Sequence, residues 1–334
     1  MCMVKASAYG SGSVEVSRAL QYWNCDYLAV AFVDEGVDLR QEGIRMPILV
    51  LDPSVEALER IVEYDLEPEI YSFRVLRAMQ DVLLRLKKKN YPIHIKIDTG
   101  MHRAGFEEND ITELISLLKN ASEIKVVSVF SHLVGSDDEL FDDFTKNQIA
   151  DFRTCAEYIE EQIGYPILKH ILNSSGIERF SLYQFDMVRL GIGLWGVTCF
   201  DNQLKNVCSL KTRISQIRTV KKGETIGYSR NGVLFRDSKI ALLPLGYADG
   251  IDRRLGNGVL SVLINGKSYP TIGNICMDLM MVDVTDAVDV EEGCEVTVFG
   301  DTQSLSEVAK LLGTIPYEVL TSVAPRVRRV YFDE

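Results

Sequence analysis

The stretch YLAVAFVDEGVDLRQEGIRMPILVL (27–51) decides the fold, because it places two short apolar runs on either side of a polar segment. The runs are YLAVAF (27–32) and ILVL (48–51). Continuous apolar runs of this length are typical of strands in a parallel sheet that is covered on both faces. Strands that alternate with helical sequence indicate an α/β fold.

The same alternation continues over the first 200 residues. Apolar residues recur at helical spacing over Ser13–Trp23, which predicts a helix with Ser13 as its cap. Similar periodicity predicts helices over 54–64, 73–89, 110–119 and 141–163. Helix-like sequence separates eight candidate strands, which span 1–6, 27–32, 48–51, 69–71, 93–98, 125–131, 168–173 and 187–190. Eight such units are what a (β/α)8 TIM-type barrel requires, so we predict that fold.

From residue 207 onward the pattern changes to short strand-like runs joined by turn signals. The segment VLSVLINGKSYPTIG (259–273) predicts a hairpin around Asn265-Gly266. Further strands are predicted in KIALLPLG, MMVDV and EVTVFG, and only Ser304–Leu312 has a helical pattern. We therefore predict a barrel domain over 1–203 and a mainly-β domain over 204–334.

Composition and charge exclude several classes of protein. Hydrophobic residues make up 46% of the chain and charged residues 25%, which is enough apolar sequence for a full core. The net charge of −12 argues against nucleic acid as the main partner. No apolar run approaches the length of a membrane helix, and the start is not a signal peptide. Seven cysteines without paired spacing predict reduced cytoplasmic thiols, and neither a disulfide frame nor a zinc site.

Reactive residue types fall where the predicted barrel strands end. Lys5 ends the first strand, Asp98–Arg103 the fifth, His132 the sixth, Asn173-Ser174 the seventh and Arg189–Gly191 the eighth. In a barrel these carboxyl ends form one rim, which carries the chemistry. A single lysine there is usually solvated, and a single histidine is usually structural. A lysine, a histidine and two arginines that converge on one rim indicate an active site.

Two small-residue segments lie after the last two predicted strands. NSSG (173–176) and LGIG (190–193) supply free backbone amides where barrels commonly bind phosphate. A phosphate-bearing cofactor beside a barrel lysine suggests pyridoxal 5'-phosphate (PLP) bonded to Lys5.

Ordered motifs along the whole chain resemble those of the alanine racemases. MVKASAYGSG (3–12) is similar to the family's lysine motif. The matches continue in order with KIDTGMHRAGF, SHLVGSDD, HILNSSG, VRLGIGLWG, IGYSRNG, LPLGYADG, IGNICMD and TIPYEV. DEGVDLR and LEPEIYSF also resemble the racemase half of enzymes in which a cell-wall peptide ligase is fused to the racemase.

The resemblance implies a PLP-dependent, two-base racemisation of L- and D-alanine that supplies D-alanine for peptidoglycan. Lys5 would hold PLP and serve the D-face of the substrate, and Tyr228 would serve the L-face. A phenol is a weak base at neutral pH, so positive charge from His132 and Arg189 is expected nearby. Arg189 would face the pyridine nitrogen.

The resemblance also implies the binding residues. The cofactor set comprises Lys5, Tyr9, His132, Asn173, Ser174, Arg189, Gly191, Ile192 and Tyr317. The substrate set comprises Arg103, Met277, Tyr247 and Asp278. Lys96 matches a lysine that is often carbamylated in the family and whose negative charge then orients Arg103; a plain ion-pairing lysine is the alternative. Tyr228, Tyr247 and Cys276–Asp278 are implied to reach the site from a second subunit, which predicts a homodimer.

The sequence departs from the family pattern in three places. Ser7 and Ser11 replace the usual asparagine and histidine of the lysine motif. Asn274 stands where many racemases carry an arginine near the tyrosine. The chain also begins almost at the lysine, which indicates a start that is clipped, wrongly assigned or cut from a longer fusion.

Three rival functions are open to the sequence. A PLP-dependent amino-acid decarboxylase shares the barrel, but Arg189 stands where decarboxylases present an acid to the pyridine ring. A non-catalytic PLP carrier of the single-barrel type lacks the β domain. An inactive racemase-like scaffold in a fusion protein would not need Lys5 and Tyr228.

Overall fold

The computed structural model describes residues 1–200 and 204–332, which form two compact units. The first unit consists of Met1–Ala8 and Gly12–Leu194 with a short piece from Thr198 on. The second consists of Tyr9–Ser11, Trp195–Val197 and the chain from Leu204 on. The predicted boundary at 203 and 204 borders residues 201–203, which lie outside the described residues.

The first unit is a curled parallel sheet of seven strands in sequence order, which confirms the predicted fold class. Its strands are β1 (Cys2–Met3), β2 (Leu28–Val30), β3 (Ile48–Val50), β4 (Glu67–Ile70), β5 (Tyr91–Lys96), β6 (Ile124–Phe130) and β7 (Leu168–His170). Each connection between neighbours carries helical sequence, because parallel strands need a crossover.

The predicted eighth strand, 187–190, is reduced to one bridging residue. Leu190 pairs with Cys2 in parallel, and its carbonyl oxygen accepts a hydrogen bond from the Met3 amide at 2.9 Å. On the other side, the Arg189 amide donates to the Leu172 carbonyl at 3.0 Å. The segment therefore connects the last strand region to the first and closes the sheet on itself.

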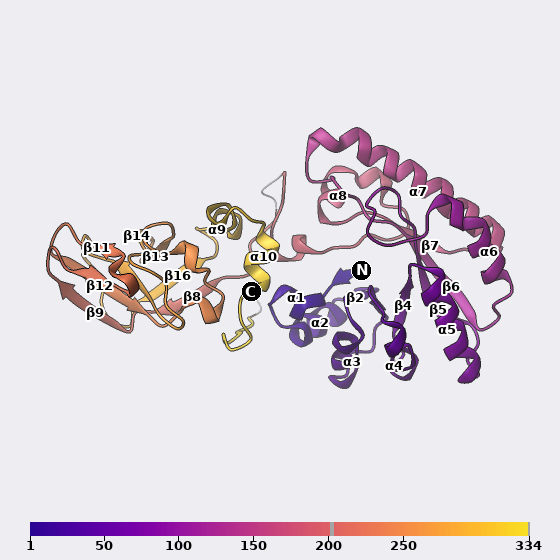
Figure 1. Ribbon diagram of the computed structural model, residues 1–334, viewed down its shortest axis with the longest axis horizontal. Coiled ribbons are helices and arrows are strands. Elements are labelled where there is room, and N and C mark those ends of the chain that lie inside the picture. Colours follow the sequence, from indigo (N-terminus) through magenta and orange to yellow (C-terminus); the bar gives the residue numbers. More distant parts are fainter. Residues whose placement is uncertain (201–203, 333–334) are drawn as a thin grey trace. The chain divides into compact units, whose positions relative to one another are not determined.

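Helices lie around the outside of these strands (Figure 1). They are α2 (Ser13–Tyr22), α3 (Val33–Gln41), α4 (Leu58–Glu63), α5 (Phe73–Arg85), α6 (Ile111–Lys119), α7 (Asp142–Ile163) and α8 (Ser174–Arg179). The short element α1 (Lys5–Tyr9) differs from them, because its backbone is left-handed. The predicted cap of α2 is wrong: Ser13 is its first helical residue, Gly12 is the cap, and no side chain caps this end.

The apolar core of the first unit lies between the sheet and the helices. Helix α5 shows the pattern, because its buried residues Val75, Leu76, Met79, Val82 and Leu83 recur at helical spacing. Each fully buried side chain of this kind stabilises the fold by about 1.5–3 kcal/mol. The interior of the sheet differs, since alternate positions of β4 to β7 carry buried polar side chains.

The second unit is mainly β, as predicted. One sheet has the order β15-β12-β9 and another the order β14-β13-β16-β8, while β10 pairs with β11. The strands are β8 (Leu210–Arg213), β9 (Gln216–Val220), β10 (Thr225–Ile226), β11 (Gly232–Val233), β12 (Ser238–Leu243), β13 (Ser261–Ile264), β14 (Lys267–Pro270), β15 (Met280–Asp283) and β16 (Glu295–Phe299).

The hairpin predicted around Asn265-Gly266 joins β13 to β14. Both turn residues have positive φ, 49° at Asn265 and 75° at Gly266, which matches the turn that the twist of a hairpin favours. Two helices follow β16, namely α9 (Leu305–Leu312) and α10 (Pro316–Thr321). The prediction of a single helix here is therefore wrong, because α10 has only six residues and shows too little periodicity.

In the described part of the chain, no helix combines the length and the apolar character needed to cross a bilayer.

Candidate active site

Lys5 begins a left-handed turn two residues after β1. The backbone φ angles of Ala6, Ser7, Ala8 and Tyr9 lie between 49° and 56°. Left-handed backbone costs about 1–2 kcal/mol for each L-residue, so four in succession need support from their surroundings. Strain of this kind concentrates at functional sites.

Glu35 at the start of α3 supplies that support. Its carboxylate accepts hydrogen bonds from the Ala6 amide at 2.6 Å, the Ala31 amide at 2.7 Å and the Phe32 amide at 3.1 Å. Burial and then the positive charge of Arg103 lower the pKa of Lys5. A larger neutral fraction makes this amine a better nucleophile and base than a solvated lysine.

The loop after β5 is folded tightly on the Asp98 carboxylate. This carboxylate accepts from the amides of Gly100, Met101 and His102 at 2.8, 3.0 and 3.1 Å. Gly105 closes the loop with a φ of 133°, where a Cβ would lie 2.6 Å from the Asp98 nitrogen. The loop carries Arg103, which is exposed. Its guanidinium has no hydrogen bond or ion pair with any residue that the structure describes.

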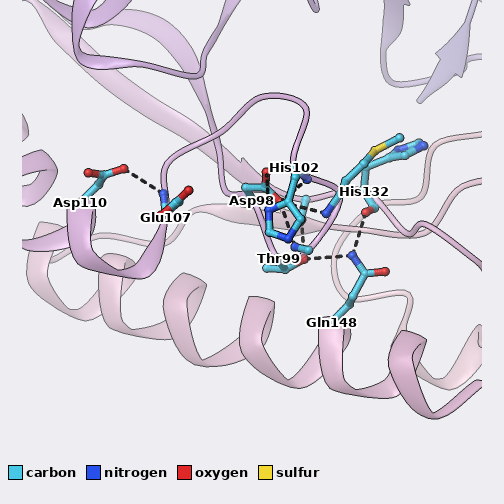
Figure 2. A network of polar contacts seen from close by, with 10 residues as sticks. Asp98, Thr99, His102, Glu107, Asp110, His132 and Gln148 are labelled. Carbon is cyan, nitrogen blue, oxygen red and sulfur yellow. Dashed lines mark hydrogen bonds and ion pairs between the residues drawn. The ribbon is translucent and has the colours of Figure 1, made fainter.

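Gln148 of α7 connects this loop to the loop after β6 (Figure 2). Its amide nitrogen donates to the His132 carbonyl at 3.2 Å and lies 3.5 Å from the Thr99 hydroxyl oxygen, while its oxygen accepts from the Val134 amide at 3.0 Å. Thr99 also contacts the Ser131 hydroxyl at 2.8 Å. The rim segments after two neighbouring strands are thereby held together.

Arg189 is buried, and its two terminal nitrogens donate five hydrogen bonds. One nitrogen reaches the His170 ring at 2.8 Å and the His170 carbonyl at 3.1 Å. The other reaches the carbonyls of Ser131 and Ile171 and the His132 ring, at 2.6, 3.0 and 3.2 Å. Burial lowers its pKa to about 10, so the guanidinium stays charged at neutral pH. Its Nε has no acceptor among the described residues.

His132 is neutral in this arrangement. A guanidinium is a donor only, so His132 Nδ1 accepts from Arg189 and the proton resides on Nε2. Burial and then Arg189 hold the pKa of His132 well below its usual value. The expectation that His132 adds positive charge is therefore wrong, and Arg189 is the charged member of the pair.

Lys96 and Glu69 face the same interior as Arg189. Burial lowers the pKa of Lys96 to about 8, against the opposing effect of Glu69. Burial raises the pKa of Glu69 to about 7, against the effect of Lys96, Arg189 and Arg103. The Lys96 ammonium lies 4.5 Å from the ring centroid of Phe130. Glu69 is thus the buried carboxyl group that faces the positive charges of Lys96, Arg189 and Arg103.

Ser174 organises the predicted phosphate segments in the first unit. Its hydroxyl accepts from the amides of Gly191 at 3.0 Å and Gly193 at 3.1 Å, which places the segment containing Ile192 against it. Asn173 caps α8 by accepting from the Gly176 amide at 2.9 Å. The structure therefore brings Asn173, Ser174, Gly191 and Ile192 together. The Asn173 side chain is used to cap α8.

Tyr9 and Tyr317 meet in the second unit. Their ring centroids lie 5.9 Å apart, and Trp195 lies 6.3 Å from Tyr9 on the same ring cluster. Burial and then Tyr317 raise the pKa of the Tyr9 phenol, so it remains protonated and can donate a hydrogen bond.

Tyr228 lies in the second unit with 70% of its surface exposed. It begins a short 3-10 helix, Tyr228–Arg230, in which Ser229 has a φ of 57°. The Asn274 side chain donates to the Tyr228 carbonyl at 3.0 Å and accepts from the Asn231 side chain at 3.0 Å. Asn274 therefore fixes the backbone that presents this phenol.

The predicted substrate residues of the second unit lie on adjoining segments. The Tyr247 amide donates to the Cys276 carbonyl at 3.0 Å, and the Met277 carbonyl accepts from the Ala248 amide at 2.9 Å. Arg326 joins the two segments, since it donates to Asp249 and Asp278, each at 2.7 Å.

Sequence reasoning missed four residues that organise these clusters: Glu35, Glu69, His170 and Arg326. Signals for three were present in the sequence: Glu35 follows an apolar strand, Glu69 begins the predicted strand 69–71, and His170 stands at the start of HILNSSG. Arg326 had no comparable signal, because only the tertiary structure brings it to two acids 48 and 77 residues away.

Two family models together match almost the whole chain. The model for the N-terminal domain of alanine racemase matches residues 1–199. The model for the C-terminal domain of alanine racemase matches residues 207–331.

Individual proteins agree with the family models. The chain is 38% identical to alanine racemase 2 of Caldanaerobacter subterraneus subsp. tengcongensis, over 99% of this chain and 87% of that protein. The solved alanine racemase of Clostridium difficile 630 superposes with a TM-score of 0.91 at 34% identity, over 98% of this chain and 87% of that one. The Bartonella henselae alanine racemase with covalently bound pyridoxal phosphate gives 0.88 at 30%, over 99% and 92%. The chain belongs to the alanine racemase family.

Proposed function

We propose that the protein interconverts L- and D-alanine with PLP as cofactor, by a two-base mechanism, and so supplies D-alanine for peptidoglycan. The observation that carries the proposal is the environment of Arg189. Five hydrogen bonds hold the terminal nitrogens of this buried guanidinium, and its Nε has no acceptor among the described residues. That Nε is the donor available to the pyridine nitrogen of PLP. A permanent cation there cannot give the ring a proton, which disfavours the decarboxylase alternative.

The residues of the chain fit PLP. Lys5 has a lowered pKa, as covalent attachment to an aldehyde requires. The Ser174 hydroxyl with the amides of Gly191 and Gly193 suits a phosphate, and Ile192 lies between those glycines. Tyr9 and Tyr317 are phenols that would complete the phosphate set. When bound, PLP withdraws electrons from Cα of the amino acid and makes its proton easier to remove.

Racemisation needs one base on each face of the substrate. Lys5 Nζ would exchange the proton on the D-face, and Tyr228 Oη would exchange it on the L-face. His132, neutral with its proton on Nε2, is placed to donate a hydrogen bond while its Nδ1 accepts from Arg189. Arg189 then supplies the positive charge on that side of the site.

The substrate carboxylate would be bound by Arg103 and the Met277 amide, with Tyr247 and Asp278 beside it. Arg103 has no ion pair among the described residues, which leaves its guanidinium free for a carboxylate. Lys96 would orient Arg103 after carbamylation, because a lysine whose pKa is lowered to about 8 keeps a sizeable neutral fraction, the form that adds to carbon dioxide.

The catalytic unit would be a homodimer. Tyr228, Tyr247 and Met277 are large side chains left substantially exposed within the second unit, which is typical of a surface covered by a partner. Residues 1–203 would form the PLP-binding domain, and residues 204–334 would contribute to the site of the partner subunit.

Two finer assignments complete the proposal. DEGVDLR and LEPEIYSF support a closer kinship with the racemase half of ligase–racemase fusions. Seven free cysteines, two of them with sulfurs 3.4 Å apart at Cys2 and Cys25, support a reducing cytoplasmic location.

A racemase assay and a labelling experiment test the proposal together. Purified protein with PLP should produce D-alanine from L-alanine in an assay coupled to D-amino-acid oxidase, and Lys5→Ala should abolish this. Borohydride reduction followed by peptide mapping should place the pyridoxyl group on Lys5. Release of carbon dioxide from an amino acid, or a label on another lysine, would refute it; PLP binding without turnover would favour the inactive scaffold.

A further inference from the structure

A column of buried polar side chains crosses the interior of the barrel below Arg189. The His170 ring accepts from Arg189 through Nδ1 at 2.8 Å, and its Nε2 lies 2.9 Å from the Ser128 hydroxyl. The same hydroxyl lies 2.7 Å from His94 Nδ1, and His94 Nε2 lies 2.7 Å from a carboxylate oxygen of Glu67. The column Glu67–His94–Ser128–His170 therefore takes one residue from each of the strands β4 to β7.

The column is unusual for its position. Barrel interiors are filled mainly by branched apolar side chains, because buried polar groups lose their hydration. His94, Ser128 and His170 are nevertheless fully buried, and only Glu67 keeps 13% of its side chain exposed. Every hydrogen-bonding atom named above has a partner within the column, so the column is a satisfied network.

The two ends of the column determine the direction of every hydrogen bond. Arg189 can only donate, so His170 Nδ1 accepts and the His170 proton lies on Nε2. Nε2–H donates to Ser128, whose own hydroxyl proton is then directed to His94 Nδ1. His94 carries its proton on Nε2 and donates it to Glu67, which as a carboxylate can only accept.

The surroundings keep the His170 imidazole neutral and bring an aromatic side chain against each ring. Burial and then Arg189 hold the pKa of His170 well below its usual value. Phe130 stacks on the His170 ring at 4.8 Å with 5° between the planes. The Tyr27 ring meets the His94 ring edge-on at 5.8 Å. Each histidine ring is therefore held by hydrogen bonds at both nitrogens and by an aromatic neighbour.

We propose that Glu67, His94 and Ser128 are positioning residues for Arg189. A chain of donors that ends on a carboxylate fixes His170 in the tautomer that accepts from Arg189, and it strengthens that acceptor through cooperative polarisation. The guanidinium is thereby held in one orientation with its Nε directed to the site. The expected effect on activity rests on the role proposed for Arg189. The predicted histidine tautomers do not depend on that role.

The test uses nitrogen NMR of the histidine rings in the intact purified protein. The chain has only four histidines, so four imidazole signals report the whole set. His94 and His170 should each carry a proton on Nε2 and none on Nδ1, as the directions of their hydrogen bonds require. The exposed His102 lies outside the column and serves as the internal reference. A proton on Nδ1 of either column histidine, or two protons on either ring, would overturn the proposal.

Cutting the column at Ser128 tests its action on Arg189. Ser128→Ala should shift the His170 signals and lower kcat by about three- to tenfold with KM little changed, the scale of one hydrogen bond. Ser128→Thr keeps the hydroxyl and should restore both. Ser17→Ala is the matched control, since Ser17 is equally buried and its hydroxyl has no hydrogen-bond partner among the described residues.

The remaining outcomes distinguish failure of the positioning role from failure of the proposed function. Normal racemisation in Ser128→Ala, with unchanged His170 signals, would refute the positioning role. The predicted tautomers in a protein that does not racemise alanine would support the column and refute the function instead. Should Ser128→Ala fail to fold, Glu67→Gln removes the charge at the partly exposed end and keeps an acceptor. It should lower kcat while His94 stays protonated on Nε2, and an unchanged kcat would count against the proposal.

Discussion

At the scale of single residues, burial decides which protonation state each site group carries. Lys5 and Lys96 have lowered pKa values because an ammonium loses hydration on burial. His132 is neutral for the same reason, whereas Arg189 remains charged because its intrinsic pKa is so high. One fixed cation among neutral or partly neutral bases suits proton transfer near neutral pH.

Replacing Tyr228 with phenylalanine tests the second base. Racemisation should fall by roughly 10²-fold or more, the usual scale for the loss of a positioned proton-transfer group. The loss should be greater for abstraction from L-alanine, because Lys5 still serves the D-face. Exchange of the D-alanine α-proton in deuterated water, followed by proton NMR, should therefore be less affected.

The absorbance of bound PLP is the control for this variant, since Lys5 and the phosphate segments are untouched. It should match that of the unmodified protein. Near-normal racemisation by a correctly loaded Tyr228→Phe protein would show that another group is the L-face base.

Glu69 predicts how the stability of the protein changes with pH. Its pKa rises from 4.5 when unfolded to about 7 when folded, so between these values the folded protein binds more protons. The free energy of unfolding should then fall as the pH rises from 5 to 7, by an amount on the order of 1–3 kcal/mol. Glu69→Gln, which is neutral throughout, should lose less over the same interval.

Urea unfolding at pH 5, 6 and 7 measures both proteins. Lys96 contributes little between pH 5 and pH 7, because it is protonated in both the folded and the unfolded protein there. Its effect falls between pH 8 and pH 10.5, where the unfolded protein binds more protons and stability should rise with pH. An identical pH dependence for the two proteins would contradict the assignment of a buried, perturbed carboxyl to Glu69.

At the scale of elements, the site depends on two segments whose backbone conformation is held by side-chain carboxylates. Glu35 accepts from the Ala6 amide in the left-handed α1, and Asp98 accepts from three amides of the loop after β5. In both segments a carboxylate replaces the hydrogen bonds that a regular helix or strand would supply. Each segment then carries a charged side chain of the site, Lys5 or Arg103.

Gly105 is where the second segment should be most sensitive. Gly105→Ala should destabilise the protein by about 2–4 kcal/mol, because it combines a positive φ with a backbone clash. The added Cβ would lie 2.6 Å from the Asp98 nitrogen. The KM for alanine should also rise, because Arg103 lies in the displaced loop.

Gly164→Ala is the matched control for this substitution. Gly164 ends α7 with a φ of 83° and has open space where the Cβ would be placed, so only the backbone cost of about 1 kcal/mol applies. Urea unfolding compares the two variants. Equal destabilisation would show that the contact with Asp98 relaxes without penalty.

At the scale of the whole molecule, the proposed sharing of active sites would make dimerisation part of catalysis. If Tyr228 acts on the site of its partner, Lys5→Ala and Tyr228→Phe proteins complement each other. Random exchange of subunits in a 1:1 mixture makes half of the dimers mixed, and each mixed dimer has one intact site. About a quarter of the wild-type activity should therefore return.

Native mass spectrometry should be used alongside the activity assay to show that mixed dimers form. Activity that stays at the level of the separate variants, with mixed dimers present, would place both bases in the same subunit.

The sequence by itself determined the order of elements and proposed a set of candidate site residues. Apolar strand runs and helical periodicity depend on neighbours a few positions away, so the α/β pattern and the change to a β-rich region could be predicted locally. The strand ends also located Lys5, Arg103, His132 and Arg189, because the topology of a barrel brings all strand ends to one rim. Short or irregular elements such as α10 and the segment 187–190 were the ones predicted incorrectly.

Only the tertiary structure decided the electrostatic state and the support of those residues. His132 is neutral because it is buried and because it lies beside a guanidinium that is 57 positions away in the chain. Glu69 and the column from Glu67 to His170 acquire their roles from neighbours on adjacent strands, contacts that no local pattern encodes. Hydration and Coulomb energies depend on distance in space and on burial, and both are set only once the chain has closed into the barrel.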